Sequence, residues 1–200
     1  MQIRFLLSVA VAALLTPAVQ ADTSAPPQDE GEVVVTASPF ARNSEETPTI
    51  VEKVDRESIL TAGGASVTDA LANLPGISST GFAAGASRPI IRGMDATRVR
   101  VLENGTSSAD VSDIGPDHGI PIDPLAAQSI EVVRGPATLR YGSQAIGGVV
   151  NILNNRVPMA LPTQPLSAEF TGSYGTAADV GQTSLLADAK LGDFALHADG

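Results

Sequence analysis

Residues 132–153 constrain the fold of this chain more strongly than any other stretch. Both ends of the stretch are rich in β-branched residues, which favour extended backbone and predict two buried strands. Within the stretch these residues are Val132, Val133, Val149, Val150 and Ile152, and Ile130 comes just before it. Pro136 ends the first strand, because proline has no N–H to donate to a sheet. The connection between the strands must be compact, with glycine wherever a Cβ would be in the way.

The connection does not match a phosphate-binding loop. Residues 142–148 are followed by no Lys-Ser or Lys-Thr pair and open no helix. On the residues alone, the stretch is a Gly-rich connector within an α+β domain. Two arginines, Arg134 and Arg140, place positive charge beside the predicted strands.

The run RGPATLRYGSQAIGGVVNI resembles the end of the plug domain of TonB-dependent outer-membrane receptors. That family typically shows R-G-P, then L-Y-G, then G-G-V-(V/I)-N-I, whereas here an arginine separates the leucine from the tyrosine. The resemblance implies that the plug motif and its anchor are formed by Arg134, Gly135, Pro136, Arg140, Tyr141, Gly142, Gly147, Gly148 and Asn151. We expect carboxylates on the surrounding barrel wall to hold the two arginines, since charge-assisted contacts are strong yet exchangeable.

The resemblance extends over about residues 32–157. Within it, residues 48–158 are predicted to form an α+β plug domain, a small mixed sheet with short helices near residues 56–61 and 67–73. Asp55 is placed to cap the first helix, and Ser66 with a carboxylate three residues later resembles a capping box.

Residues 1–21 predict a secretion signal. Arg4 supplies the positive start, residues 5–15 are apolar, and small residues precede a cleavage point at Ala21. The apolar run is too short to cross a bilayer as a helix, and a buried N-terminal helix is the alternative. Residues 22–47 are predicted to be a flexible linker.

A short β-prone run interrupts this linker. On composition alone it is an ordinary first strand, but the resemblance implies a TonB box that binds TonB by strand addition. The run consists of Glu32, Val33, Val34, Val35, Thr36 and Ala37. A receptor that also signals to an anti-sigma factor would need a further domain before the box, and residues 22–31 are too few to form one.

The overall charge of −10 disfavours nucleic acid as a partner, because nucleic-acid-binding surfaces are basic. The chain has no cysteine, which excludes disulfides, Cys-ligated metals and a lipid-anchored cysteine from these 200 residues.

Residues 106–123 are predicted to be a long loop dense in oxygen donors. Its candidate metal ligands are Asp113, Asp117, His118 and Asp123. Their spacing is neither that of an EF-hand nor that of a helical histidine pair, so a solvated polar loop is the alternative. The loop also resembles receptors of the zinc-uptake branch, through Pro116-Asp117-His118-Gly119 and Ile122-Asp123-Pro124-Leu125, which favours zinc or a metal chelate as the cargo, with no cofactor required. The sequence does not separate these from a siderophore, haem, cobalamin or a carbohydrate.

Residues 159–200 change periodicity. Apolar and polar residues alternate in successive segments, and Gly192-Asp193 suits a two-residue hairpin turn. This pattern predicts a linker and the first strands of a transmembrane β-barrel, truncated at residue 200. A soluble antiparallel sheet is the alternative. The resemblance implies a complete barrel of about 22 strands with the plug inside.

Together these features predict a TonB-dependent receptor or transporter in the outer membrane of a Gram-negative bacterium. The plug and TonB box would face the periplasm, and the partners would be TonB, membrane lipid and a small transported ligand. No nucleophile and base lie in a known catalytic motif, so we expect no enzyme. The alternative is a secreted soluble α+β binding domain or hydrolase with His118 in its site.

Overall fold

The computed structural model describes seven ranges of the chain: 33–34, 42–43, 50–83, 85–108, 111–158, 160–176 and 179–200. All of them belong to the compact unit Gly31–Gly200. The predicted secretion signal and most of the predicted linker and TonB box lie outside the described residues. Of the box, only Val33 and Val34 are described.

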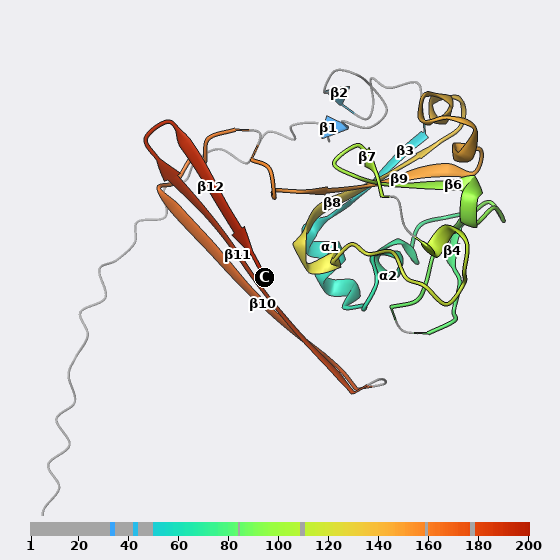
Figure 1. Ribbon diagram of the computed structural model, residues 1–200, viewed down its shortest axis with the longest axis horizontal. Helices are drawn as coiled ribbons and strands as arrows, with labels where there is room; N and C mark the ends of the chain where they lie inside the picture. The colour runs from blue at the N-terminus through green and yellow to red at the C-terminus, as the bar shows by residue number, and fades with distance from the viewer. Residues whose placement is uncertain are drawn as a thin grey trace, which may run out of the picture. The chain divides into compact units, whose positions relative to one another are not determined.

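A five-stranded mixed sheet forms the centre of the plug, in the order β3-β8-β9-β6-β7 (Figure 1). Its strands are β3 (Ile50–Asp55), β6 (Val99–Glu103), β7 (Thr106–Ser107), β8 (Ala127–Arg134) and β9 (Gly148–Asn154). Strand β8 is antiparallel to both of its neighbours, β3 and β9, whereas the central strand β9 is parallel to β6. The small mixed sheet expected from the sequence is therefore confirmed.

Two short helices follow β3, and local side chains set their ends. In α1 (Arg56–Ala62) the Asp55 carboxylate accepts a hydrogen bond from Ser58 N at 2.8 Å, and this bond lowers the pKa of Asp55. Helix α2 (Val67–Leu71) starts with the predicted capping box of Ser66 and Asp69. This helix ends two residues earlier than predicted, because the backbone turns toward Pro75.

The helices cover one face of the sheet and create the main core (Figure 1). Fully buried Val67 and Leu71 of α2 belong to the same cluster as Ile130, Val132 and Val150 of the sheet. The opposite face carries a smaller cluster, in which Val133, Val149 and Leu102 meet the short turns that follow β8. Both faces of the sheet are therefore buried, which explains the nearly continuous apolar runs of β8 and β9.

Short elements connect these parts. They are the paired strands β4 (Ile77–Ser79) and β5 (Pro89–Ile91), and the 3-10 turns η2 (Ala96–Arg98), η3 (Val111–Asp113), η4 (Pro124–Ala126), η5 (Pro136–Tyr141) and η6 (Ser143–Ala145). Asn104 and Gly105, with φ of 49° and 78°, form the tight turn between β6 and β7 that their sequence predicts. Strand β1 (Val33–Val34) pairs antiparallel with β2 (Arg42–Asn43).

A separate antiparallel sheet consists of β10 (Leu166–Gly175), β11 (Val180–Leu191) and β12 (Phe194–Asp199). The pairing register places mainly apolar residues on one face: Leu166, Ala168, Phe170, Tyr174, Leu185, Ala187, Ala189, Leu191, Phe194, Leu196 and Ala198. The other face carries mainly polar and charged residues. This alternation, with the large apolar side chains exposed, is that of outer-membrane barrel strands.

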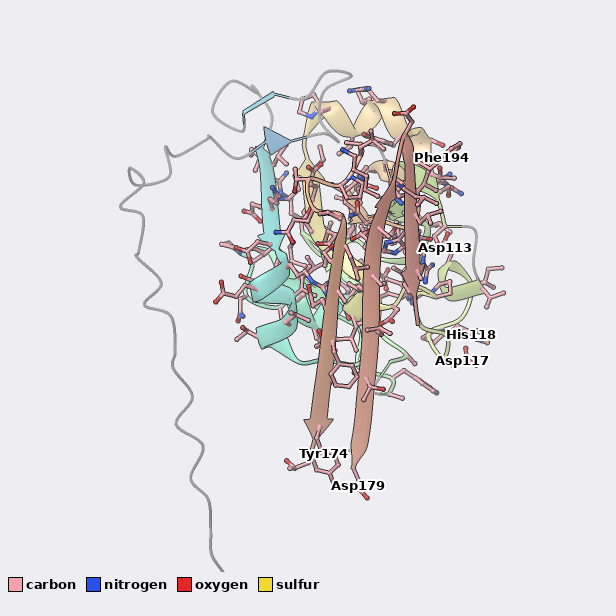
Figure 2. All side chains as sticks on the ribbon, turned by 90° about the vertical axis from the view of Figure 1, so that its left-hand side faces the viewer. Asp113, Asp117, His118, Tyr174, Asp179 and Phe194 are labelled. Atoms are coloured by element: carbon pink, nitrogen blue, oxygen red, sulfur yellow. The ribbon has the colours of Figure 1, made fainter. Side chains whose placement is uncertain are left out.

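Aromatic residues lie at both ends of the apolar face. Figure 2 shows Tyr174 beside Asp179 at one end of the sheet and Phe194 at the other. The Tyr174 hydroxyl donates a hydrogen bond to the Asp179 carboxylate across the end of the β10–β11 hairpin. Aromatic girdles of this kind border the apolar band of outer-membrane strands. Among the helices in the described ranges, none combines the length and apolar character needed to cross a membrane.

Candidate functional site

Arg134 joins the plug motif to the turn that follows α2. Its Nη1 donates a hydrogen bond of 2.7 Å to the carbonyl oxygen of Pro75, in the Leu-Pro-Gly turn after α2. Its Nη2 forms an ion pair with Glu52 of β3. The register pairs Ile50 with Arg134, so Glu52 is the diagonal neighbour of Arg134 on one face of the sheet.

A carboxylate therefore does hold Arg134, but it lies in the plug itself, and a further contact with a carboxylate of the barrel wall stays a prediction. The plug supplies the carboxylate itself, because β3 and β8 pair in a register that brings Glu52 within reach. Two buried atoms of this pair, Arg134 Nε and Glu52 Oε2, nevertheless have no hydrogen-bond partner among the described residues. Buried polar atoms in native proteins usually have one, so the pair still has capacity for a further contact.

Arg140 lies in η5 and is exposed, with its guanidinium carbon 6.0 Å from the ring centroid of Tyr141. A barrel-wall partner for Arg140 stays a prediction. Burial raises the pKa of Tyr141, the charge of Arg140 opposes this rise, and the carboxylate of Glu131 adds to it.

The motif glycines are required by backbone conformation and by space. Gly135 and Gly142 have φ of 87° and 92°, with ψ of −156° and −178°, in a region that is essentially restricted to glycine. A Cβ on Gly147 would lie 2.9 Å from the Cβ of Met94 and 3.0 Å from the carbonyl oxygen of Arg98. Gly147 N also donates a 2.8 Å hydrogen bond to that same oxygen, which fixes the close approach.

Asn151, the last polar residue of the motif, stabilises the β6–β7 turn. Its Oδ1 accepts a 2.8 Å hydrogen bond from Gly105 N, and the residue is buried. Opposite it in the ladder lies Glu131, which is fully buried. Glu131 was not singled out from the sequence as a buried polar residue of the motif. The signal that could have found it is a carboxylate in the middle of a β-branched run.

The four candidate metal ligands do not gather. His118 Nε2 lies 3.8 Å from Asp117 Oδ1, and both side chains are about half exposed. Asp123 instead caps η4, where its Oδ1 accepts a 2.9 Å hydrogen bond from Leu125 N. Asp113 lies in η3, apart from His118 and Asp117 in Figure 2.

Within the ranges that the structure describes, no group of three or more His, Cys, Asp or Glu side chains could hold a metal ion. The predicted set of Asp113, Asp117, His118 and Asp123 is therefore corrected to one exposed histidine with a neighbouring carboxylate. The reason is local: the N-cap of η4 uses Asp123, and the turn of residues 111–113 places Asp113 elsewhere.

Comparison with known proteins identifies the fold. The family model of the TonB-dependent Receptor Plug Domain matches residues 43–149. The chain is 35% identical over 152 residues to the hemin receptor of Yersinia enterocolitica, which covers 72% of this chain and 22% of that protein. It is also 35% identical over 131 residues to the iron-regulated outer membrane virulence protein of Vibrio cholerae, covering 62% of this chain and 20% of that protein.

Solved structures show the same fold. The pyoverdine outer membrane receptor of Pseudomonas aeruginosa superposes with a TM-score of 0.62 at 19% identity, over 80% of this chain and 22% of that one. A ferric enterobactin receptor variant of Pseudomonas aeruginosa gives a TM-score of 0.59 at 20% identity, over 84% of this chain and 26% of that one. The chain spans about a fifth of the length of the curated relatives that it matches. It belongs to the TonB-dependent receptor plug-domain family, the outer-membrane receptors of Gram-negative bacteria, and not to a family of enzymes.

Proposed function

We propose that this chain is the N-terminal part of a receptor that takes up an iron chelate, and that the chelate is haem. The observation that carries the proposal is the similarity to two proteins named hemin receptors, at 35% and 33% identity over 72% of the chain. The plug would close the barrel. TonB would bind the predicted box of residues 32–37 by strand addition and would supply the energy for passage of the cargo.

The domain division follows from the same proposal. Residues 1–21 are the secretion signal, 22–47 the linker with its TonB box, 48–158 the plug, and 159–200 a linker with the first barrel strands. The match of the family model to residues 43–149 and the change to alternating strands at Leu166 support these boundaries.

The described residues of the plug suit haem better than a bare zinc ion. A protein zinc site normally needs three or four protein ligands, and the described residues bring no such group together. Haem iron is already held by its macrocycle and takes one or two axial ligands from protein, of which histidine is common. A single exposed imidazole among the described residues is therefore enough for an axial haem ligand, whereas zinc would need further ligands from elsewhere in the receptor.

His118 is the histidine with the access that this role needs. Its side chain is 52% exposed, whereas the side chain of His197, the second histidine, is 5% exposed and lies beside Asp188. Asp117, at 3.8 Å, is close enough to orient the His118 ring once the ligand is bound. We assign His118 as an axial ligand of the cargo iron.

A haem titration of the full-length receptor in detergent tests this assignment. His118→Gln should weaken haem binding by about tenfold or more and should change the absorption spectrum of the bound haem. Asp117→Asn, which keeps the imidazole, is the matched control and should weaken binding much less. Equal affinity and an unchanged spectrum in His118→Gln would refute the axial role.

Growth of a strain that depends on this receptor separates the cargo classes. We expect growth on haem as the iron source and none that depends on the receptor under zinc limitation. Growth on ferric siderophore but not on haem would keep the iron-chelate receptor and refute haem. Growth that depends on the receptor only under zinc limitation would refute both haem and any other iron chelate as the cargo.

A further inference from the structure

We propose that three residues on the polar face of β10–β12 form a docking row that holds the plug in place while the cargo passes. Glu169 of β10 pairs directly with Leu186 of β11, and Leu186 pairs directly with Asp199 of β12. The three side chains therefore lie side by side across the sheet, at one level and on one face. This inference rests on the proposed transport function.

The first contact of the docking row is an ion pair between Arg56 and Glu169. Arg56 Nε lies 2.9 and 3.1 Å from the two carboxylate oxygens of Glu169, and its Nη2 also reaches one of them. The Nη1 of Arg56 donates to the carbonyl oxygens of Leu125 and Ala127, at 3.0 and 2.6 Å. One guanidinium thus joins the strand carboxylate to the backbone at the start of β8, an inner strand of the plug sheet.

The second contact is apolar. Leu186 is a large apolar side chain on an otherwise mainly polar face, and it is buried, with 5% of its surface exposed. Strand β11 meets η4 in this region, where Pro124, Leu125 and Ala126 are also buried. The break that Leu186 makes in the polar alternation therefore has a packing reason.

The third contact runs through Arg156, which follows β9 at the end of the plug. Arg156 lies 3.1 Å from Asp199 of β12 and 3.3 Å from Glu103 of the plug strand β6. The neighbouring His197 extends the network, with its Nδ1 2.7 Å from Asp188. Arg156 thereby connects the third member of the row to a strand of the central sheet.

All three contacts attach to the β-sheet core of the plug or to the turn that leads into it. The first and third contacts are charge-assisted and the second is apolar, so together they resist sliding at this level. We infer that the side of the plug facing β10–β12 remains seated during transport. The cargo then passes along another side of the plug.

Cross-linking across the first contact tests this inference. Arg56 and Glu169 meet through long side chains, so a direct disulfide between their positions is geometrically unfavourable. In the full-length receptor, Arg56→Cys with Glu169→Cys should react with a short, reducible bifunctional thiol reagent, and each single variant is the control. The linked receptor should still take up haem at a rate within about twofold of the unlinked one.

Two results would overturn the inference. One is a linked receptor that binds haem without transporting it and recovers transport when the linker is reduced. The other is failure to form the link although each single cysteine reacts with the reagent. If the parent receptor takes up no haem at all, the proposed cargo fails, while the yield of the link still tests the docking row.

A permeability measurement gives an independent readout. Glu169→Gln removes one of the two carboxylate charges of the row, the partner of Arg56, and should raise sensitivity to a large antibiotic such as vancomycin by about fourfold or more. Glu57→Gln, which alters an exposed acid of α1, is the matched control and should leave sensitivity unchanged. Equal sensitivity of the Glu169→Gln variant and the parent, at equal receptor levels, would overturn the docking role.

Discussion

The buried pair of Arg134 and Glu52 offers the sharpest test of how the plug motif works. Arg134→Met removes the charge and keeps much of the side-chain volume. The Arg134 side chain is 7% exposed and that of Glu52 is 25% exposed, so the variant leaves a mostly buried carboxylate without its partner. It also removes the donor to the Pro75 carbonyl.

The magnitude follows from burial. Removing one partner of a buried ion pair costs about 3–5 kcal/mol, and the partial exposure of Glu52 places the expected loss near the lower end, at about 3 kcal/mol. For a domain of this size such a loss lowers the unfolding temperature by roughly 10 °C. The double variant Arg134→Met/Glu52→Met should recover at least half of the loss, because no unpaired charge remains.

Calorimetry of the full-length receptor, read at the plug transition, measures both values. The single variant should also admit large antibiotics, since a loosened plug no longer closes the barrel. A double variant that is destabilised by the sum of two separate single losses would refute the coupling between Arg134 and Glu52. A single variant as stable as the parent would refute the account of this motif.

Three further predictions follow from other positions. Gly147→Ala should destabilise the plug by about 1–3 kcal/mol, because its Cβ has no room, while Gly172→Ala, in open space, is the control that should stay near the parent in thermal unfolding. Val34→Pro should abolish energised uptake and leave cell-surface ligand binding intact, since proline cannot donate in an added strand; equal loss of both would indicate misfolding. Asp55→Ala should cost about 1 kcal/mol in chemical unfolding at pH 7, through loss of the helix cap. Because the folded pKa of Asp55 is lowered, this difference should be present above the unfolded value of 3.8 and be lost as pH falls below it; a difference that does not change with pH would contradict the role of the cap.

Local chemistry made much of this fold predictable. Asp55 and Ser66 mark the helix starts because their side chains bond to backbone N–H groups only a few residues away. Asn104-Gly105 specifies its turn because both residues tolerate positive φ. The strands on either side of Gly135 follow from β-branched runs that proline and glycine interrupt.

Long-range partners could not be predicted in the same way. Glu52 becomes the partner of Arg134 only through the register of β3 and β8, which no local pattern specifies. The docking of Glu169 against Arg56 likewise depends on how helix α1 and the separate β10–β12 sheet meet. The candidate metal set failed for a related reason, since closeness in sequence within a loop does not determine where Asp113 and Asp123 point.

Accumulation of radiolabelled haem by whole cells tests the central claim most directly. The full-length receptor should be expressed in otherwise identical strains with and without TonB, under iron limitation. We predict that both strains bind haem at the surface and that only the strain with TonB accumulates it inside, with His118→Gln reducing both binding and uptake. Equal accumulation in the two strains, or no haem binding by the parent receptor, would contradict the claim.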